Sequence, residues 1–96
     1  MIVHIVMFDF KEENKAANIT KTKEMLNALV SKIEPLISME VGLDFNGSER
    51  AMDLSLISMF ETKEGLIEYA THPAHLDVVA FIKEVTLASK VVDYIR

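Results

Sequence analysis

The chain has 96 residues, a formal net charge of −5, no cysteine, and a hydrophobic fraction of 50%. The length predicts a single domain, residues 1–96, and the missing cysteine excludes disulfides, thiolate chemistry and cysteine-based zinc sites. The acidic balance without a run of lysine or arginine argues against a nucleic-acid partner, because phosphate binding needs a basic surface. So much apolar sequence in so short a chain favours an oligomer, because a small monomer cannot hide it all.

The N-terminal segment, residues 1–10, predicts a strand. It is rich in isoleucine, valine and phenylalanine, and too short and too β-branched for a core helix. No basic stretch precedes it and it stops being apolar at Asp9, so we expect neither a signal peptide nor a membrane partner. With the absence of cysteine, this is consistent with a cytoplasmic protein.

The middle of the chain predicts a helix and a hairpin. The helix covers about residues 14–34 and ends at Pro35. Residues 39–46 alternate apolar and polar side chains, which is typical of a strand, and residues 52–61 supply a second strand that pairs with the first. The expected buried stripe of the helix is Ile19, Leu26, Leu29, Val30 and Ile33.

The last third predicts a helix that Pro73 interrupts, followed by a strand at 86–95. Thr62 is a cap for the first part, about 63–71. His72 takes the cap position of the second part, about 74–84, with Pro73 at its first helical position. The second part is expected to bury Leu76, Val79, Ala80 and Val85. The order β-α-β-β-α-β predicts a ferredoxin-like α+β fold with a four-stranded antiparallel sheet.

Both faces of this predicted sheet are apolar. On the first strand, one face carries Ile2, Val6, Phe8 and Phe10, and the other carries Val3, Ile5 and Met7. Helices on one side of a sheet cover only one of its faces. We therefore expect a homodimer in which the two bare faces pack together into an eight-stranded, barrel-like core. The lumen of that barrel is the expected place for a small, largely apolar ligand.

Two of the three histidines and one of the two tyrosines lie in one short segment, 69–75 (YATHPAH). Tyrosine and imidazole are the groups in this chain suited to proton transfer near neutral pH. If the break at Pro73 turns both side chains inward, His75 can remove a proton from carbon while Tyr69 hydrogen-bonds the developing enolate. The alternative is structural, with Tyr69 at the edge of the core and His75 in solvent.

The other two histidines also have two interpretations each. His72 either contacts a ligand or caps the helix at Pro73, with a ring nitrogen accepting a backbone N–H. His4 lies on the strand face of Val6 and Phe8, where it is either bonded to the backbone or placed at the lumen beside a polar partner. The candidate ligand-binding residues are therefore His4, Val6, Phe8 and His72.

We expect no metal and no cofactor. Three histidines suit zinc, but Pro73 disrupts a helical arrangement of His72 and His75, and no cysteine or obviously paired carboxylate accompanies them. Asp93 stands alone in an otherwise apolar strand. We expect its carboxylate to pair across the dimer or to face solvent.

Four segments together resemble the stress-responsive α/β-barrel (Dabb) family of dimeric α+β barrels. They are residues 4–8 (HIVMF) with Lys11, residues 40–42 (EVG), residues 69–75, and residues 91–94 (VVDY). They occur in this order and span nearly the whole chain. The resemblance implies the dimeric barrel fold.

A plant polyketide cyclase of that family closes a linear poly-β-ketone into an aromatic ring by an aldol-type reaction without a metal. The resemblance implies that the second histidine of the His-Pro-x-His motif, His75, is the general base, with Tyr69 as its partner. It also implies that His4 and His72 lie at the pocket. The predicted first helix, however, offers no aromatic residue for a pocket wall.

Three functions stay open. The first is a small-molecule binding or stress-associated protein with an apolar lumen. The second is a cofactor-free cyclase or lyase that uses His75 and Tyr69. The third is a purely structural oligomer whose lumen is packed solid by Phe8, Phe10 and Phe60.

Overall fold

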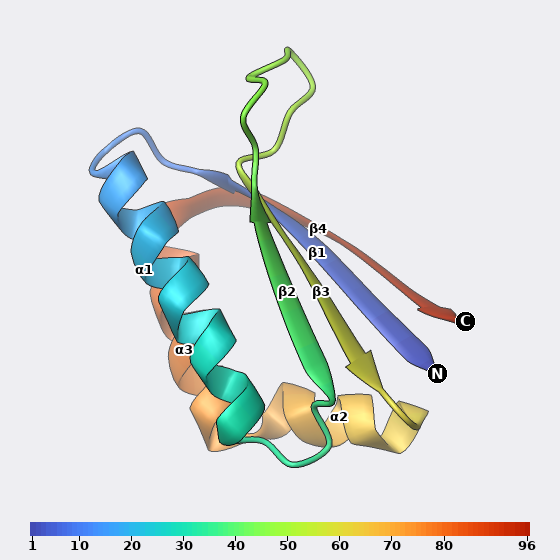
Figure 1. The fold of residues 1–96 in the computed structure, drawn as a ribbon. Coiled ribbons are helices and arrows are strands. Elements are labelled where there is room, and N and C mark those ends of the chain that lie inside the picture. Colours follow the sequence, from blue (N-terminus) through green and yellow to red (C-terminus); the bar gives the residue numbers. More distant parts are fainter.

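Four antiparallel strands and three α-helices form two layers, with the helices on one face of the sheet (Figure 1). The computed structural model describes all residues, 1–96. The sheet order is β2-β3-β1-β4, which confirms the predicted ferredoxin-like fold. In chain order the elements are β1 (Ile2–Phe10), α1 (Lys15–Ala28), a short 3₁₀ helix (Leu29–Ser31), β2 (Ser38–Leu43), β3 (Leu54–Phe60), α2 (Lys63–Thr71), α3 (Pro73–Val85) and β4 (Thr86–Ile95).

Side-chain caps set the start of α2 and of α3. The Thr62 hydroxyl accepts a hydrogen bond from the Gly65 backbone N–H at 3.0 Å. The Nδ1 atom of His72 accepts one from the Ala74 N–H, also at 3.0 Å, and Pro73 occupies the first turn. Both caps satisfy backbone donors that a helix N-terminus otherwise leaves open. Both predicted caps are confirmed.

The buried stripes of the helices agree only in part with expectation. Along α1 and the turn after it, Leu26, Leu29 and Ile33 are buried as predicted, while Val30 is exposed. Along α3 the buried residues are Val78 and Ile82. The predicted stripe on α3 is wrong at Leu76 and Ala80, which are exposed.

The hairpin between β2 and β3 is confirmed, but β2 ends earlier than predicted, at Leu43. Asp44 begins the loop, and its Oδ2 atom accepts a hydrogen bond from the Gly47 N–H at 2.7 Å. Gly47 has a φ of 64°, in the left-handed region that favours glycine. Phe45 is therefore a loop residue with 97% of its surface exposed. The loop projects past the end of the sheet (Figure 1).

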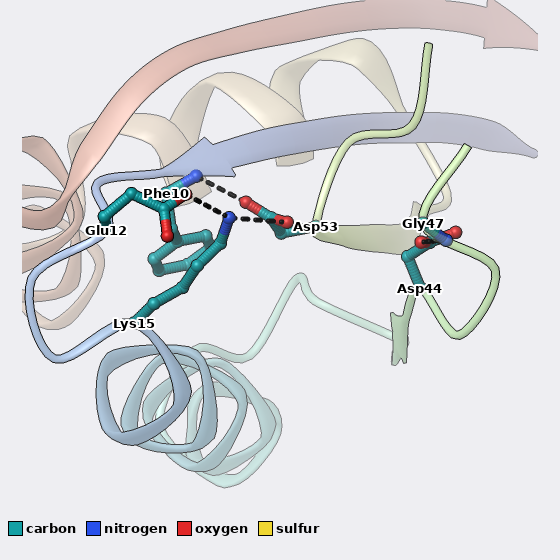
Figure 2. A network of polar contacts seen from close by, with 6 residues as sticks. All are labelled: Phe10, Glu12, Lys15, Asp44, Gly47 and Asp53. Carbon is teal, nitrogen blue, oxygen red and sulfur yellow. Dashed lines mark hydrogen bonds and ion pairs between the residues drawn. The ribbon is translucent and has the colours of Figure 1, made fainter. Parts of the chain in front are cut away.

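Asp53, at the end of this loop, contacts the end of β1 and the start of α1 (Figure 2). One carboxylate oxygen accepts a hydrogen bond from the Phe10 N–H at 2.7 Å. The other lies 3.3 Å from the ammonium of Lys15, which also pairs with Glu12 at 3.2 Å. Burial opposes the charge on Asp53, but the Phe10 N–H, the Asp9 side chain and Lys15 outweigh it, so its pKa is lowered.

A carboxyl whose pKa is lowered in the folded state stabilises the fold above its unfolded-state pKa, near 3.9, and loses that contribution as the pH falls through the folded value. We therefore expect Asp53→Asn to lower the free energy of unfolding by about 1 kcal/mol at pH 7. The difference from the unmodified protein should shrink as the pH falls below about 3.9 and should be much smaller at pH 2 than at pH 7. Urea denaturation at both pH values measures this, with Glu49→Gln in the exposed loop as the control. A difference that is the same at both pH values would contradict it.

The sheet face turned away from the helices is uncovered (Figure 1), and the side chains on it are largely apolar. We call it the open face. Its central row crosses all four strands, with Glu40, Ile57, Ile5 and Val92 in register. Ile57 is 36% exposed and Val92 is 52% exposed. The other apolar residues on this side of the sheet are Met7, Met59 and Tyr94, together with Val3, which is only 1% exposed. None of the helices has the length and apolar character needed to cross a membrane.

Candidate functional site

A cavity of about 160 Å³ lies between the sheet and the α-helices. It brings together three of the predicted site residues, His4, Tyr69 and His75, and two of the predicted wall residues, Val6 and Phe8. The apolar walls are Val6, Phe8, Leu26, Leu56, Val79 and Ile82. A small apolar space with a few convergent polar groups is typical of a ligand site.

This cavity is not where the predicted lumen lies. His4, Val6 and Phe8 face the helices, because their side of β1 packs against the core with α1 and α3. The expectation that they line a space between two sheets of a dimer is therefore wrong. The period-two alternation of a strand sends these side chains to the side opposite the open face. The cavity thus belongs to a single protomer.

The break between α2 and α3 brings Tyr69 and His75 together. Tyr69 lies in the last turn of α2, and His75 lies in the first turn of α3. Between them Pro73 ends one helix and starts the next. The two rings stack at a centroid distance of 4.2 Å, tilted by 39°. The inward turn expected at Pro73 therefore occurs.

The hydrogen bond of His75 fixes which ring nitrogen is free. Its Nδ1 atom lies 3.1 Å from the carbonyl oxygen of Ala70. A carbonyl only accepts, so Nδ1 carries the proton and Nε2 keeps its lone pair in the neutral ring. Burial lowers the pKa of His75, and His4 and His72 lower it further, against the Ala70 hydrogen bond, which raises it. At neutral pH, His75 is thus a neutral base with a free Nε2.

Tyr69 is a hydrogen-bond donor without a partner in the protein. Its side chain is 1% exposed and packs against Phe60 at a centroid distance of 5.1 Å. Burial raises its pKa to about 12, so the hydroxyl stays protonated at neutral pH. Every fully buried side-chain nitrogen or oxygen has a hydrogen-bond partner. The unpaired hydroxyl is therefore not sealed off, and Tyr69 is one of the residues that line the cavity.

Asp93 forms a hydrogen bond with His4 of the same protomer. The two residues are opposite each other in the β1–β4 register, and His4 Nδ1 donates a hydrogen bond to Asp93 Oδ1. We expected the Asp93 carboxylate to pair across a dimer or to face solvent; it bonds to His4 of its own chain, and its side chain stays 47% exposed to solvent. A carboxylate that accepts from Nδ1 fixes the tautomer and the orientation of an imidazole. The His4 ring meets Tyr69 edge-on at 6.3 Å.

His72 does not line the cavity. Its Nδ1 atom is used as the cap of α3, which is the structural one of its two predicted interpretations. No group of three histidine, cysteine, aspartate or glutamate side chains is arranged to hold a metal ion.

A larger hollow of about 470 Å³ lies on the surface beside α2, lined by Glu34, Glu61 and Glu68. Three carboxylates in one hollow repel an acidic ligand, and no histidine or tyrosine lines it. The chemistry of the chain is concentrated instead in the smaller cavity at Tyr69 and His75.

The model of the stress responsive A/B barrel domain family, Dabb, matches residues 2–96. The chain belongs to this family. Two relatives from Arabidopsis thaliana are stress-response A/B barrel domain-containing proteins, one 37% identical over 79 residues and the other 31% identical over 80 residues. The matches cover 82% and 80% of this Dabb chain, but 30% and 69% of the two relatives. This Dabb chain therefore corresponds to less than a third of the first relative.

A solved structure supports the same assignment for the fold. A dimeric ferredoxin-like protein of unknown function from Bacteroides fragilis superposes on this Dabb chain with a TM-score of 0.89 and 32% identity. The match covers 97% of this chain and 93% of the other. The Dabb fold expected from the sequence is therefore confirmed.

Proposed function

We propose that each protomer of this Dabb protein binds a small, largely apolar molecule in the cavity between its sheet and its helices. The observation that carries the proposal is a cavity with apolar walls and an unpaired donor on a buried residue, the Tyr69 hydroxyl. A volume of 160 Å³ is close to the roughly 150 Å³ of an engineered apolar cavity that binds benzene. The matching ligand has about one ring and an oxygen that accepts from Tyr69.

The same volume favours two of the three open functions over the third. Phe8, Phe10 and Phe60 are all buried in the core on the helix side of the sheet, where they leave this cavity open and cannot fill a lumen between two sheets, which argues against a structural oligomer packed solid by them. An extended polyketide chain needs more room than a space that suits one ring. A smaller carbonyl compound is therefore the better substrate class for any chemistry at this site.

We also propose cofactor-free proton transfer as a second function of the same cavity. The free Nε2 of His75 supports it, because a neutral imidazole beside a neutral donor is the arrangement that removes a proton from carbon next to a carbonyl. His75 takes the proton from carbon as the carbon–hydrogen bond electrons move into the enolate. Tyr69 stabilises the negative charge on the enolate oxygen by donating a hydrogen bond.

The assembly that we propose is a homodimer through the open face. Its apolar row at Ile57, Ile5 and Val92 is uncovered in one protomer, and the Bacteroides fragilis relative is dimeric. The expected cytoplasmic location and the absence of a nucleic-acid partner stay predictions.

Acetophenone, a one-ring ketone, is a suitable probe of the binding proposal. We expect it to bind the unmodified protein, and Val79→Phe to weaken binding at least tenfold, because the larger side chain fills the cavity. Leu76→Phe makes a similar enlargement at an exposed position of the same helix and should leave binding unchanged. Ligand-observed saturation-transfer NMR measures both. Equal binding by Val79→Phe and the unmodified protein would place the ligand elsewhere.

A further inference from the structure

The cavity has two ends along α3, marked by His75 and Lys83. Both residues line it, as does Val79 between them. The three residues are spaced four apart, so they follow one side of the helix. An α-helix rises 1.5 Å per residue, which places the backbones of His75 and Lys83 about 12 Å apart. The cavity therefore runs from the histidine–tyrosine end to a lysine end.

The strands also place different side chains at the two ends of the cavity. At one end His4 pairs with Asp93, and at the other Phe8 lies opposite Ser89 in the same register. Ser89 lines the cavity together with Thr86. The Thr86 hydroxyl donates to the backbone oxygen of Ile82 at 2.8 Å and is thereby occupied.

Two groups at the lysine end stay free for a ligand. Lys83 and Ser89 are exposed and line the cavity, and neither side chain forms a hydrogen bond or an ion pair within the protein. Lys83 supplies a positive charge, and Ser89 supplies a hydroxyl donor. No aspartate or glutamate lines the cavity, and at the opposite end the Asp93 carboxylate accepts the hydrogen bond of His4. The one unpaired charge on the lining of this cavity is therefore positive.

We propose that the ligand carries an anionic group, such as a carboxylate, that binds Lys83 and Ser89 at the mouth. Its carbonyl then points to Tyr69 and His75 at the inner end, and its apolar body lies along Val79. This substrate class, a small acid with a separate carbonyl group, rests on the proposed function and adds the mouth residues to it. The protein as a whole has a charge of −5, so an anion is attracted here by the local cation and not by the overall field.

A pair of probes that differ only in charge tests the inference. para-Acetylbenzoate has the carbonyl, the ring and a carboxylate, and para-acetylbenzamide replaces the carboxylate by a neutral amide of similar shape. We expect the unmodified protein to bind the benzoate more tightly by about two- to fivefold at low salt, which is typical of an exposed ion pair. The preference should disappear in Lys83→Met and in high salt, because screening weakens exposed charge pairs.

Lys32→Met is the matched control, because it removes one exposed lysine that lies outside the cavity. It should keep the preference for the benzoate. Amide chemical shifts of the cavity residues give both affinities. Equal affinity for the two probes in the unmodified protein would overturn the inference while leaving the proposed binding function intact. Failure of both probes and of acetophenone to shift cavity residues would overturn the binding function and the inference together.

Discussion

Replacement of His75 by alanine is expected to slow proton abstraction from the methyl group of acetophenone by about a hundredfold or more, the usual contribution of a positioned base. The reaction is the exchange of the methyl hydrogens for deuterium in heavy water. His75 Nε2 removes a proton, Tyr69 donates a hydrogen bond to the enolate oxygen, and deuterium from the solvent returns to carbon. Loss of the methyl signal in proton NMR gives the rate.

Two further variants separate chemistry from packing. His75→Gln can still donate to the Ala70 oxygen, so it keeps the local hydrogen bond while removing the base, and it should be as slow as alanine. Tyr69→Phe keeps the ring that packs on Phe60 and should be slower than the unmodified protein but faster than His75→Ala. Equal rates for the unmodified protein and His75→Gln would contradict base catalysis by His75.

The pH dependence of this exchange follows from the state of His75. The base works only when Nε2 is unprotonated, and burial lowers the pKa of His75 below the ordinary value of about 6.5. The rate should therefore be on its plateau at neutral pH and fall only on the acidic side of 6.5. A midpoint above 6.5 would contradict the neutral, buried base.

The second large effect is expected on the assembly. The unmodified protein should have a mass of about twice 10.8 kDa at micromolar concentration, and Ile57→Lys should have the mass of a single chain. In a two-fold dimer through the open face, Ile57→Lys is present in both protomers and brings two ammonium groups into the apolar contact. An unpaired buried charge costs several kcal/mol. Light scattering after size exclusion measures both masses.

The Ile57→Lys substitution should leave the fold of the single protomer stable. Ile57 is 36% exposed in one protomer, so a lysine there can keep its ammonium in solvent when the chain is monomeric. Ile67→Lys is the control, because Ile67 is exposed on α2 and not on the open face. It should stay dimeric. A dimeric Ile57→Lys, or an unmodified protein of 10.8 kDa, would exclude this interface.

Local signals predicted the elements of the fold well. α2 and β4 begin and end where expected, because Thr62 and Pro73 are strong local signals and residues 91–95 are rich in β-branched and aromatic side chains. The buried side of α3 was harder, because residues 78–82 (VVAFI) are apolar at five successive positions. Periodicity cannot choose a face within such a run. The packing of α3 against α1 and the sheet determines which of its sides is buried.

The site residues, like the helices and strands, were predictable where their contacts are local in sequence. The segment around Pro73 identified Tyr69 and His75, because their proximity depends on a local break between helices. The partner of His4 depends on the register of β1 and β4, whose members are 89 residues apart in sequence. Asp93 could have been found by aligning the two strands as an antiparallel pair. The side of the sheet on which the cavity lies could not, because both faces of β1 are apolar.

The most direct test of the cavity is the set of nuclear Overhauser contacts between bound acetophenone and the methyl groups of the protein. The cavity between the sheet and the helices predicts contacts with Val6, Leu56 and Val79. Contacts with Ile57 and Val92 on the open face, or none with the cavity methyl groups, would contradict it.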